Sequence, residues 1–159
     1  MTITSTEIQE SIKTCLAAAF PGEMIYEEIM PQEFQRPSNL LKLMKIELDT
    51  QSLGHGAVSF RYQYKITTFT EADQVHNSHL AVLTLRAVMI LGAFAAGYLK
   101  VEDRAPRVAA LMADTGGYDS AEVLLTLTLT MDRGEFEPAE LLPIMRKLTT
   151  RYETEEEHL

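Results

Sequence analysis

Two stretches of the chain alternate more cleanly than any other between apolar and polar positions. In Ala57–Phe69 the apolar positions are largely aromatic, and in Ser120–Asp132 they are aliphatic, with threonines in between. Side chains of a strand point alternately to the two faces of a sheet, so each stretch predicts a long strand with one buried and one polar face. The polar face of the first strand carries Arg61, Gln63 and Lys65. We expect this face to be solvated or to contact another protein.

Shorter alternating segments predict further strands. Met24–Met30 and Asn39–Leu48 both read as strands, and the glycine-containing turn that follows Leu48 predicts a hairpin onto the aromatic strand. Tyr98–Asp103 and Val108–Met112 alternate more weakly. The local hairpin makes the second strand and Ala57–Phe69 antiparallel neighbours.

Three segments show helical periodicity. Thr4 and Glu7 have the spacing of a capping box ahead of an apolar stripe that includes Cys15, and Pro21-Gly22 ends this helix. A second helix is predicted from about Thr70 to about Ala96, and a third over Ala139–Tyr152. The second is apolar on nearly all sides from Leu80 onward, although its uninterrupted apolar run is too short for a membrane span. Protein must therefore cover several of its sides, which suggests an oligomer.

Together these elements predict an α+β fold, with a mixed, mostly antiparallel sheet of about five or six strands packed against two to three helices. The chain of 159 residues suits one domain over residues 1–152, followed by an acidic tail over residues 153–159. We find no internal repeat in the sequence.

Composition narrows the possible partners. The net charge of −9 argues against sequence-specific or general nucleic-acid binding, since phosphate contacts need clustered Lys and Arg. The only cysteine, Cys15, excludes an internal disulfide, and the start of the sequence lacks the pattern of a signal peptide. We therefore expect synthesis in the cytoplasm and no membrane partner.

Catalytic signatures are weak. His76 and His79 are three residues apart near the predicted start of the second helix, which is one way to begin a metal site, but further ligands in a recognisable spacing are lacking. The adjacent acids Glu27 and Glu28 would point to opposite faces of a strand. No nucleophile-elbow, phosphate-loop or dinucleotide motif occurs. We predict a protein without catalytic residues, cofactor or metal.

The segment Pro31–Ser38 cannot continue the preceding strand because proline lacks an amide donor. It contains two prolines, the polar residues Gln32 and Arg36, and Phe34, which we expect to be exposed. The simplest interpretation is a surface connection, and the alternative is a loop presented for assembly contacts.

A set of residues along this part of the chain resembles the tail terminator family of tailed phages and prophages of Gram-positive bacteria. The resemblance is densest over about residues 16–45 and continues by element order to about residue 132. It rests on Phe20-Pro21, Ile25-Tyr26, Glu28, Gln32, Phe34 and Arg36-Pro37. The chain departs from the family pattern at Glu33, where a glycine is common, and at Ser38-Asn39, where aromatic residues are common.

The resemblance implies a structural subunit that forms a ring, usually a hexamer, on the head-proximal end of the tail tube. Such a ring stops tube polymerisation and offers a surface for head joining, so the implied partners are other copies of the chain, the tail tube protein and a head–tail connector protein. It would assemble in the bacterial host cytoplasm and stay in the virion tail. The candidate interface residues are Tyr26, Glu28, Gln32, Phe34, Arg36 and Pro37, together with Arg61, Gln63 and Lys65.

Two other functions remain open from the sequence. A head–tail connector or neck protein would also form rings but would bind on the portal side. From a different class, a small soluble ligand-binding or metal-dependent domain would use His76 and His79.

Overall fold

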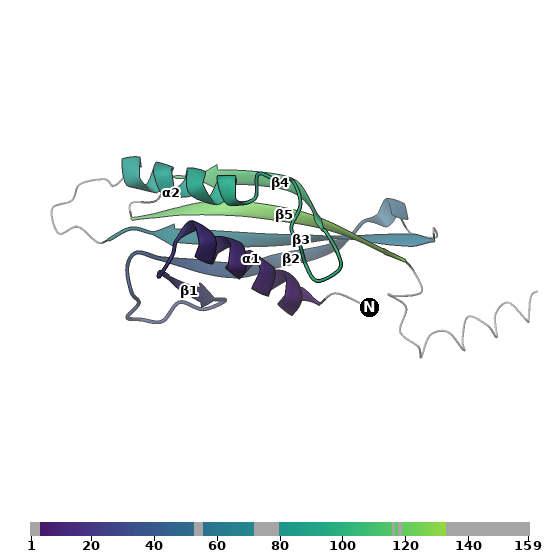
Figure 1. The fold of residues 1–159 in the computed structure, drawn as a ribbon, viewed down its shortest axis with the longest axis horizontal. Helices are drawn as coiled ribbons and strands as arrows, with labels where there is room; N and C mark the ends of the chain where they lie inside the picture. The colour runs from purple at the N-terminus through teal and green to yellow at the C-terminus, as the bar shows by residue number, and fades with distance from the viewer. Residues whose placement is uncertain (1–3, 53–55, 72–79, 116, 118, 133–159) are drawn as a thin grey trace, which may run out of the picture.

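A five-stranded sheet with the strand order β1-β2-β3-β5-β4 forms the frame of the protein (Figure 1). The computed structural model describes residues 4–52, 56–71, 80–115, 117 and 119–132. The strands are β1 (Met24–Glu27), β2 (Ser38–Leu48), β3 (Ala57–Phe69), β4 (Arg107–Asp114) and β5 (Ser120–Asp132). β1 pairs with β2 in parallel and every other pair is antiparallel, which confirms the predicted mixed, mostly antiparallel sheet.

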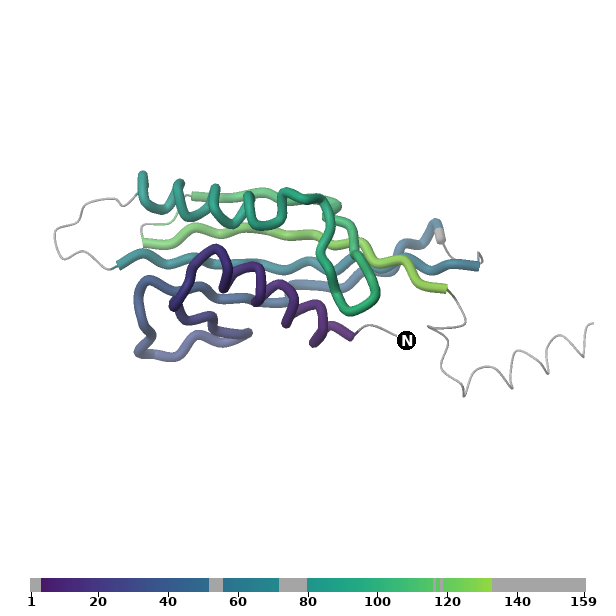
Figure 2. Tube along the Cα trace, viewed as in Figure 1, coloured from purple at the N-terminus to yellow at the C-terminus, as the bar shows by residue number. Residues whose placement is uncertain are grey.

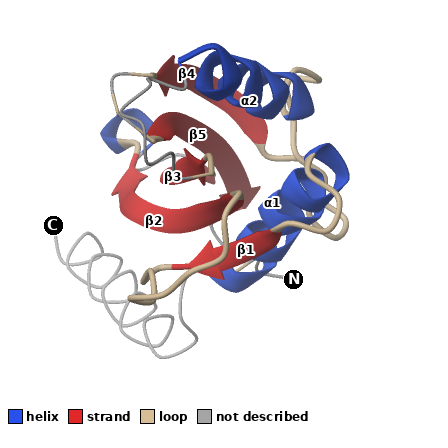
Figure 3. Ribbon diagram, turned by 90° about the vertical axis from the view of Figure 1, so that its left-hand side faces the viewer, coloured by secondary structure: helices blue, strands red, loops and turns tan. Residues whose placement is uncertain are grey.

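Two helices, α1 (Ser5–Ala19) and α2 (Leu80–Ala93), lie on the same side of the curved sheet, as an end-on view shows (Figure 3). The expected α+β class is therefore confirmed. The predicted third helix, and the boundary between residues 1–152 and the acidic tail, lie outside the described residues.

The aromatic strand is central to the core. In β3, Tyr64 and Ile66 are fully buried and lie opposite Leu125 and Val123 of β5. Alternation places these side chains on the helix-covered face, where they pack with the buried stripe of α1 and with Ile90 of α2. The large apolar side chains of β3 and β5 thus lie on the helix-covered face, and the polar side chains that alternate with them lie on the opposite face.

Helix α1 begins as its sequence predicts. The Thr4 hydroxyl accepts a hydrogen bond from the Glu7 amide at 3.4 Å, while the Glu7 carboxylate accepts one from the Thr4 amide at 2.6 Å, which completes a capping box. Its buried face consists of Ile8, Ile12 and Leu16. Cys15 beside this face is half-buried, and burial raises the pKa of its thiol, which disfavours the reactive thiolate.

Helix α2 differs in its limits from the predicted helix. It ends at Ala93, three residues earlier than expected, and Gly97 follows with a positive φ of 87°. The expected start from Thr70 falls partly on residues outside the description. Among the described helices, none has the length and apolar character needed to cross a membrane.

Three strand predictions need correction. β1 ends at Glu27, because Glu28 takes a positive φ of 63° and turns the chain away. The segment Tyr98–Asp103 forms only isolated bridges and not a strand; it loops across the sheet beside α1 (Figure 2), where Leu99 and Val101 join the core. β4 extends beyond the expected Val108–Met112 at both ends.

Candidate interface surfaces

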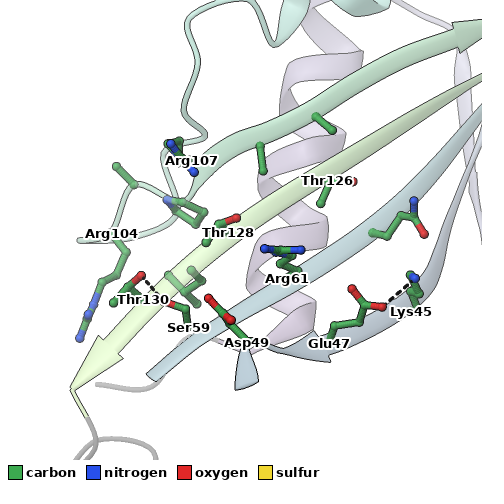
Figure 4. A pocket seen from close by; sticks show the side chains of 16 residues that line it. Lys45, Glu47, Asp49, Ser59, Arg61, Arg104, Arg107, Thr126, Thr128 and Thr130 are labelled. Carbon is green, nitrogen blue, oxygen red and sulfur yellow. Dashed lines mark hydrogen bonds and ion pairs between the residues drawn. The ribbon is translucent and has the colours of Figure 1, made fainter. Parts of the chain in front are cut away.

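The face of the sheet opposite the helices carries an open polar groove of about 920 Å³. Figure 4 shows its side chains projecting from the strands, with α1 behind the sheet. Residues from β2, β3, β4, β5 and the segment before β4 line it, including Lys45, Glu47, Arg61, Gln63, Arg104, Arg107, Thr126, Thr128 and Thr130. Two of the residues expected on this face, Arg61 and Gln63, therefore lie in one groove.

Strand register places a row of charged and polar side chains across the groove. Glu47 of β2 lies opposite Arg61 of β3, Arg61 lies opposite Thr128 of β5, and Thr128 lies opposite Arg107 of β4. Directly opposed residues share a face of the sheet, so the two arginines flank Thr128 on the open face. Among the residues that line the groove, the four basic ones outnumber the acidic Glu47 and Asp49, in a protein whose net charge is −9.

Two contacts organise the edges of this groove. Lys45 Nζ lies 2.8 Å from Glu47 Oε1, and this hydrogen bond, with Coulombic attraction to Lys45 and a smaller one to Arg61, lowers the pKa of the Glu47 carboxyl. The hydroxyls of Ser59 and Thr130 are 2.8 Å apart and share a hydrogen bond. The threonines of β5 thus supply hydroxyl donors and acceptors, which suits binding of carboxylates or amides more than acid–base chemistry.

Lys65 lies on the same face but away from the groove. Its ammonium is 3.5 Å from the carboxylate of Glu122 on β5. The structure thus brings Arg61 and Gln63 together in the groove and gives Lys65 a partner within the chain.

The outer side of α2 is a second uncovered surface. Val82, Leu85, Val88 and Met89 are 49%, 60%, 55% and 39% exposed, respectively. Beside Met89, a shallow hollow of about 420 Å³ between α1 and α2 is lined by Cys15, Ala18, Ala19, Met89 and Ala93. Contiguous exposed apolar side chains are typical of contact sites, and whether another protein covers this side of α2 stays a prediction.

Apolar side chains are also uncovered near the far end of β2. Met44, Ile46 and Leu48 are 44%, 50% and 37% exposed. Ile46 and Leu48 lie opposite Tyr62 and Phe60 of β3, on the helix side of the sheet. The described helices therefore leave this end of the apolar face partly open.

The proline-containing loop is held against the protein more closely than its sequence suggests. The expectation that Phe34 is exposed is wrong, because its ring is half-buried and packs 5.0 Å from the Phe69 ring and 6.4 Å from the Tyr26 ring. The Tyr26 hydroxyl accepts a hydrogen bond from the Gln35 amide at 2.9 Å. These contacts attach the loop to β1 and to the end of β3.

Arg36 extends this attachment. Its guanidinium lies 4.6 Å from the centre of the Phe34 ring and donates to Asp119 Oδ2 at 2.6 Å and to the Thr70 carbonyl at 3.2 Å. The following Arg36–Pro37 peptide bond is cis. Arg36 therefore joins the loop to Thr70, which follows β3, and to Asp119, which precedes β5.

The other two candidate interface residues of this region, Glu28 and Gln32, differ in their contacts. Glu28 accepts a hydrogen bond from the Leu43 amide at 3.2 Å, next to the irregular register of β2, so it supports the strand edge. Gln32 is exposed. Whether any of these residues contacts another protein stays a prediction.

A buried ion pair was missed by sequence reasoning. Arg86 of α2 is 7% exposed, donates to both carboxylate oxygens of Glu23 at 2.9 and 2.6 Å, and donates through Nε to Thr68 Oγ1 at 2.7 Å. Its guanidinium also lies 4.3 Å above the Phe20 ring. The available signal was one arginine in an otherwise apolar helix, which needs an acidic partner when buried.

The histidines of the metal hypothesis, His76 and His79, lie outside the described residues. Within the described part of the chain, no group of three or more His, Cys, Asp or Glu side chains is placed to hold a metal ion.

Comparisons with known proteins give limited similarity. No model of a protein family matches the sequence, and no curated protein matches it. Among solved structures, the sheath/tube terminator of an extracellular contractile injection system, PVC, in the extended state is 14% identical, with a TM-score of 0.47 over 83% of this chain. This chain spans 58% of the length of that terminator. Another solved structure is 15% identical, with a TM-score of 0.46 over 86% of this chain and 99% of its own.

Proposed function

We propose that this chain is a structural subunit of a tail terminator ring, which caps the head-proximal end of a phage tail tube. The observation that carries the proposal is the presence of two unlike uncovered surfaces on opposite sides of the sheet. One is the apolar outer side of α2, around Leu85 and Val88, and the other is the polar groove around Arg61. The sequence resemblance over residues 16–45 supplies the kind of assembly.

Two unlike surfaces favour a ring over a simple dimer. A two-fold dimer buries the same patch on both copies, whereas a head-to-tail contact joins one patch to a different one and closes into a ring when the rotation allows. Completing the burial of the half-exposed apolar side chains of α2 would contribute about 1 kcal/mol per residue. The hexameric number comes from the resemblance alone.

The proposed partners follow from the same reasoning. The ring would contact the tail tube protein on one side and a head–tail connector protein on the other. It would assemble in the bacterial host cytoplasm and remain in the virion tail. A net charge of −9 opposes adhesion to nucleic acid passing through such a ring.

Tail assembly in vitro tests this function. Purified chain is added to polymerising tail tube protein of the same phage or prophage, and tube lengths and ends are measured by negative-stain microscopy. We expect shorter tubes with a ring on one end. Tubes that grow to the same length without an added ring contradict the proposal.

A pull-down separates the terminator from a neck protein. Retention by the connector protein with none by the tube protein would assign the chain to the portal side instead. Elemental analysis of the purified protein addresses the metal-dependent alternative, which would require stoichiometric metal that is lost in the His76→Ala and His79→Ala variants.

A further inference from the structure

Four basic side chains (Lys45, Arg61, Arg104 and Arg107) and two acidic ones (Glu47 and Asp49) line the groove, and Glu47, which lies opposite Arg61, is hydrogen-bonded to Lys45. Within the described residues, neither Arg61 nor Arg107 forms an ion pair, and both face the groove on either side of Thr128. Neighbouring strands are about 4.8 Å apart, so these two residues stand about 10 Å from each other across the sheet. This spacing suits a ligand with several negative groups along a short segment.

Carboxylates are the negative groups that best fit this surface. Guanidinium forks bind carboxylates through paired, charge-assisted hydrogen bonds, and the threonine hydroxyls between them can donate further ones. Nucleic acid is a poorer ligand, because the overall charge of −9 repels a polyanion at long range. A short acidic peptide segment is therefore the expected occupant.

The chain itself contains such a segment. Residues 153–157 read Glu-Thr-Glu-Glu-Glu, the densest acidic run in the sequence. β5 ends at Asp132, directly opposite Ala57, and the nearby residues Ser59 and Thr130 line the groove. Residues 133–152 connect this point to the acidic run, and Thr128 lies four residues before Asp132, about 13 Å at a strand rise of about 3.3 Å per residue, so the connecting chain is longer than the distance to be spanned.

We propose that the groove binds the acidic segment 153–157 of the same chain, with Arg61 and Arg107 as the principal contacts. Tethering makes this contact intramolecular, with an effective concentration on the order of millimolar for a short linker. An external acidic partner must then displace the segment. If the groove is also an assembly surface, which rests on the proposed function, the segment delays assembly until the correct partner arrives.

Paramagnetic broadening in the full-length chain tests this contact. A nitroxide is attached to Leu159→Cys in a Cys15→Ala background, and intensities of backbone amide signals are measured for the ¹⁵N-labelled protein. We expect the amides of residues 126–130 to lose most of their intensity. They should recover it in Arg61→Gln/Arg107→Gln and when the glutamates of residues 153–157 are changed to glutamine, but not in Arg61→Lys/Arg107→Lys, which keeps the charges.

A matched control is Lys100→Gln, since Lys100 is exposed beside α1 on the other side of the sheet. It should leave the broadening unchanged. Broadening in 1 M salt should be largely lost, because the screening length falls to about 3 Å.

Two results overturn the proposal. One is no broadening of the groove amides, or broadening that persists in the double glutamine variant. The other is broadening that appears only in a mixture of two chains, one carrying the nitroxide but no ¹⁵N and the other carrying ¹⁵N but no nitroxide. That result would assign the contact to a second copy of the chain. Neither result bears on tube capping, which is measured separately.

Discussion

Arg86 and Glu23 form a two-point ion pair between α2 and the turn that leads from α1 into β1, with N–O distances of 2.9 and 2.6 Å. The side chains are only 9% and 18% exposed. The pair joins the middle of α2 to the segment that follows α1, and the bond from Arg86 to Thr68 joins the same guanidinium to β3. Removing one member would leave the other charge largely buried without its partner.

Glu23→Gln should therefore destabilise the fold by about 3 kcal/mol, since an uncompensated buried arginine is costly. Chemical denaturation measures the loss. The matched control is Glu10→Gln, which removes an exposed partner of Lys13 and should cost about 1 kcal/mol or less. Equal, small losses for the two variants would mean that the buried pair contributes little.

The loop contacts predict a loss of stability as well. Arg36→Ala should lower the free energy of unfolding by about 1–3 kcal/mol, because it removes the bonds to Asp119 and Thr70 and the stacking on Phe34. Gln32→Ala, on the same loop but exposed, is the control and should be neutral. A neutral Arg36→Ala variant that fails only in ring formation would instead support a pure interface role.

The outer side of α2 predicts an assembly defect without a folding defect. Leu85→Glu/Val88→Glu should abolish ring formation, because charged side chains would have to be buried in an apolar contact, while the melting temperature should stay nearly constant. Light scattering and negative-stain imaging measure assembly. Ala17→Glu, at an exposed position of α1, is the control and tests the effect of a charge outside the apolar side of α2. Rings that persist in the double variant would place the subunit contact elsewhere.

The buried hydroxyl of Tyr64 should make the free energy of unfolding fall at alkaline pH. Burial, chiefly, raises the pKa of its hydroxyl above the ordinary value of 10.0, and the hydroxyl donates to the Ser5 carbonyl at 3.3 Å. A raised folded-state pKa gives stability that is complete below pH 10 and is lost as the pH rises toward the folded-state value, because the unfolded chain releases the proton first.

Denaturation curves recorded from about pH 8 to about pH 11 should show this loss in the natural chain and a flatter profile in Tyr64→Phe. At neutral pH the same variant should lose about 1 kcal/mol with its hydrogen bond. Tyr98→Phe, at an exposed position, is the control and should keep the profile of the natural chain. Identical slopes in all three proteins would remove Tyr64 as the cause.

Local pattern was enough to locate the two long strands and to divide their faces. The alternation in β3 and β5 assigned Tyr64, Leu125 and their neighbours to the core and Arg61 and Gln63 to the open face, since side-chain direction in a strand depends only on position. The capping box located the start of α1 for the same local reason. The hairpin of β2 and β3 also followed from the short turn between them.

Contacts between distant segments depended on the tertiary structure. The parallel pairing of β1 with β2, the placement of Arg61 and Arg107 around Thr128, and the ion pair of Arg86 with Glu23 all join residues whose separation in sequence carries no periodic signal. Phe34 illustrates the difference: next to prolines it reads as an exposed loop residue, but the ends of β1 and β3 give it aromatic neighbours. The sequence pattern determines which side chains are buried, because apolar positions recur at the strand or helix period. The order of the strands determines which residues those side chains contact.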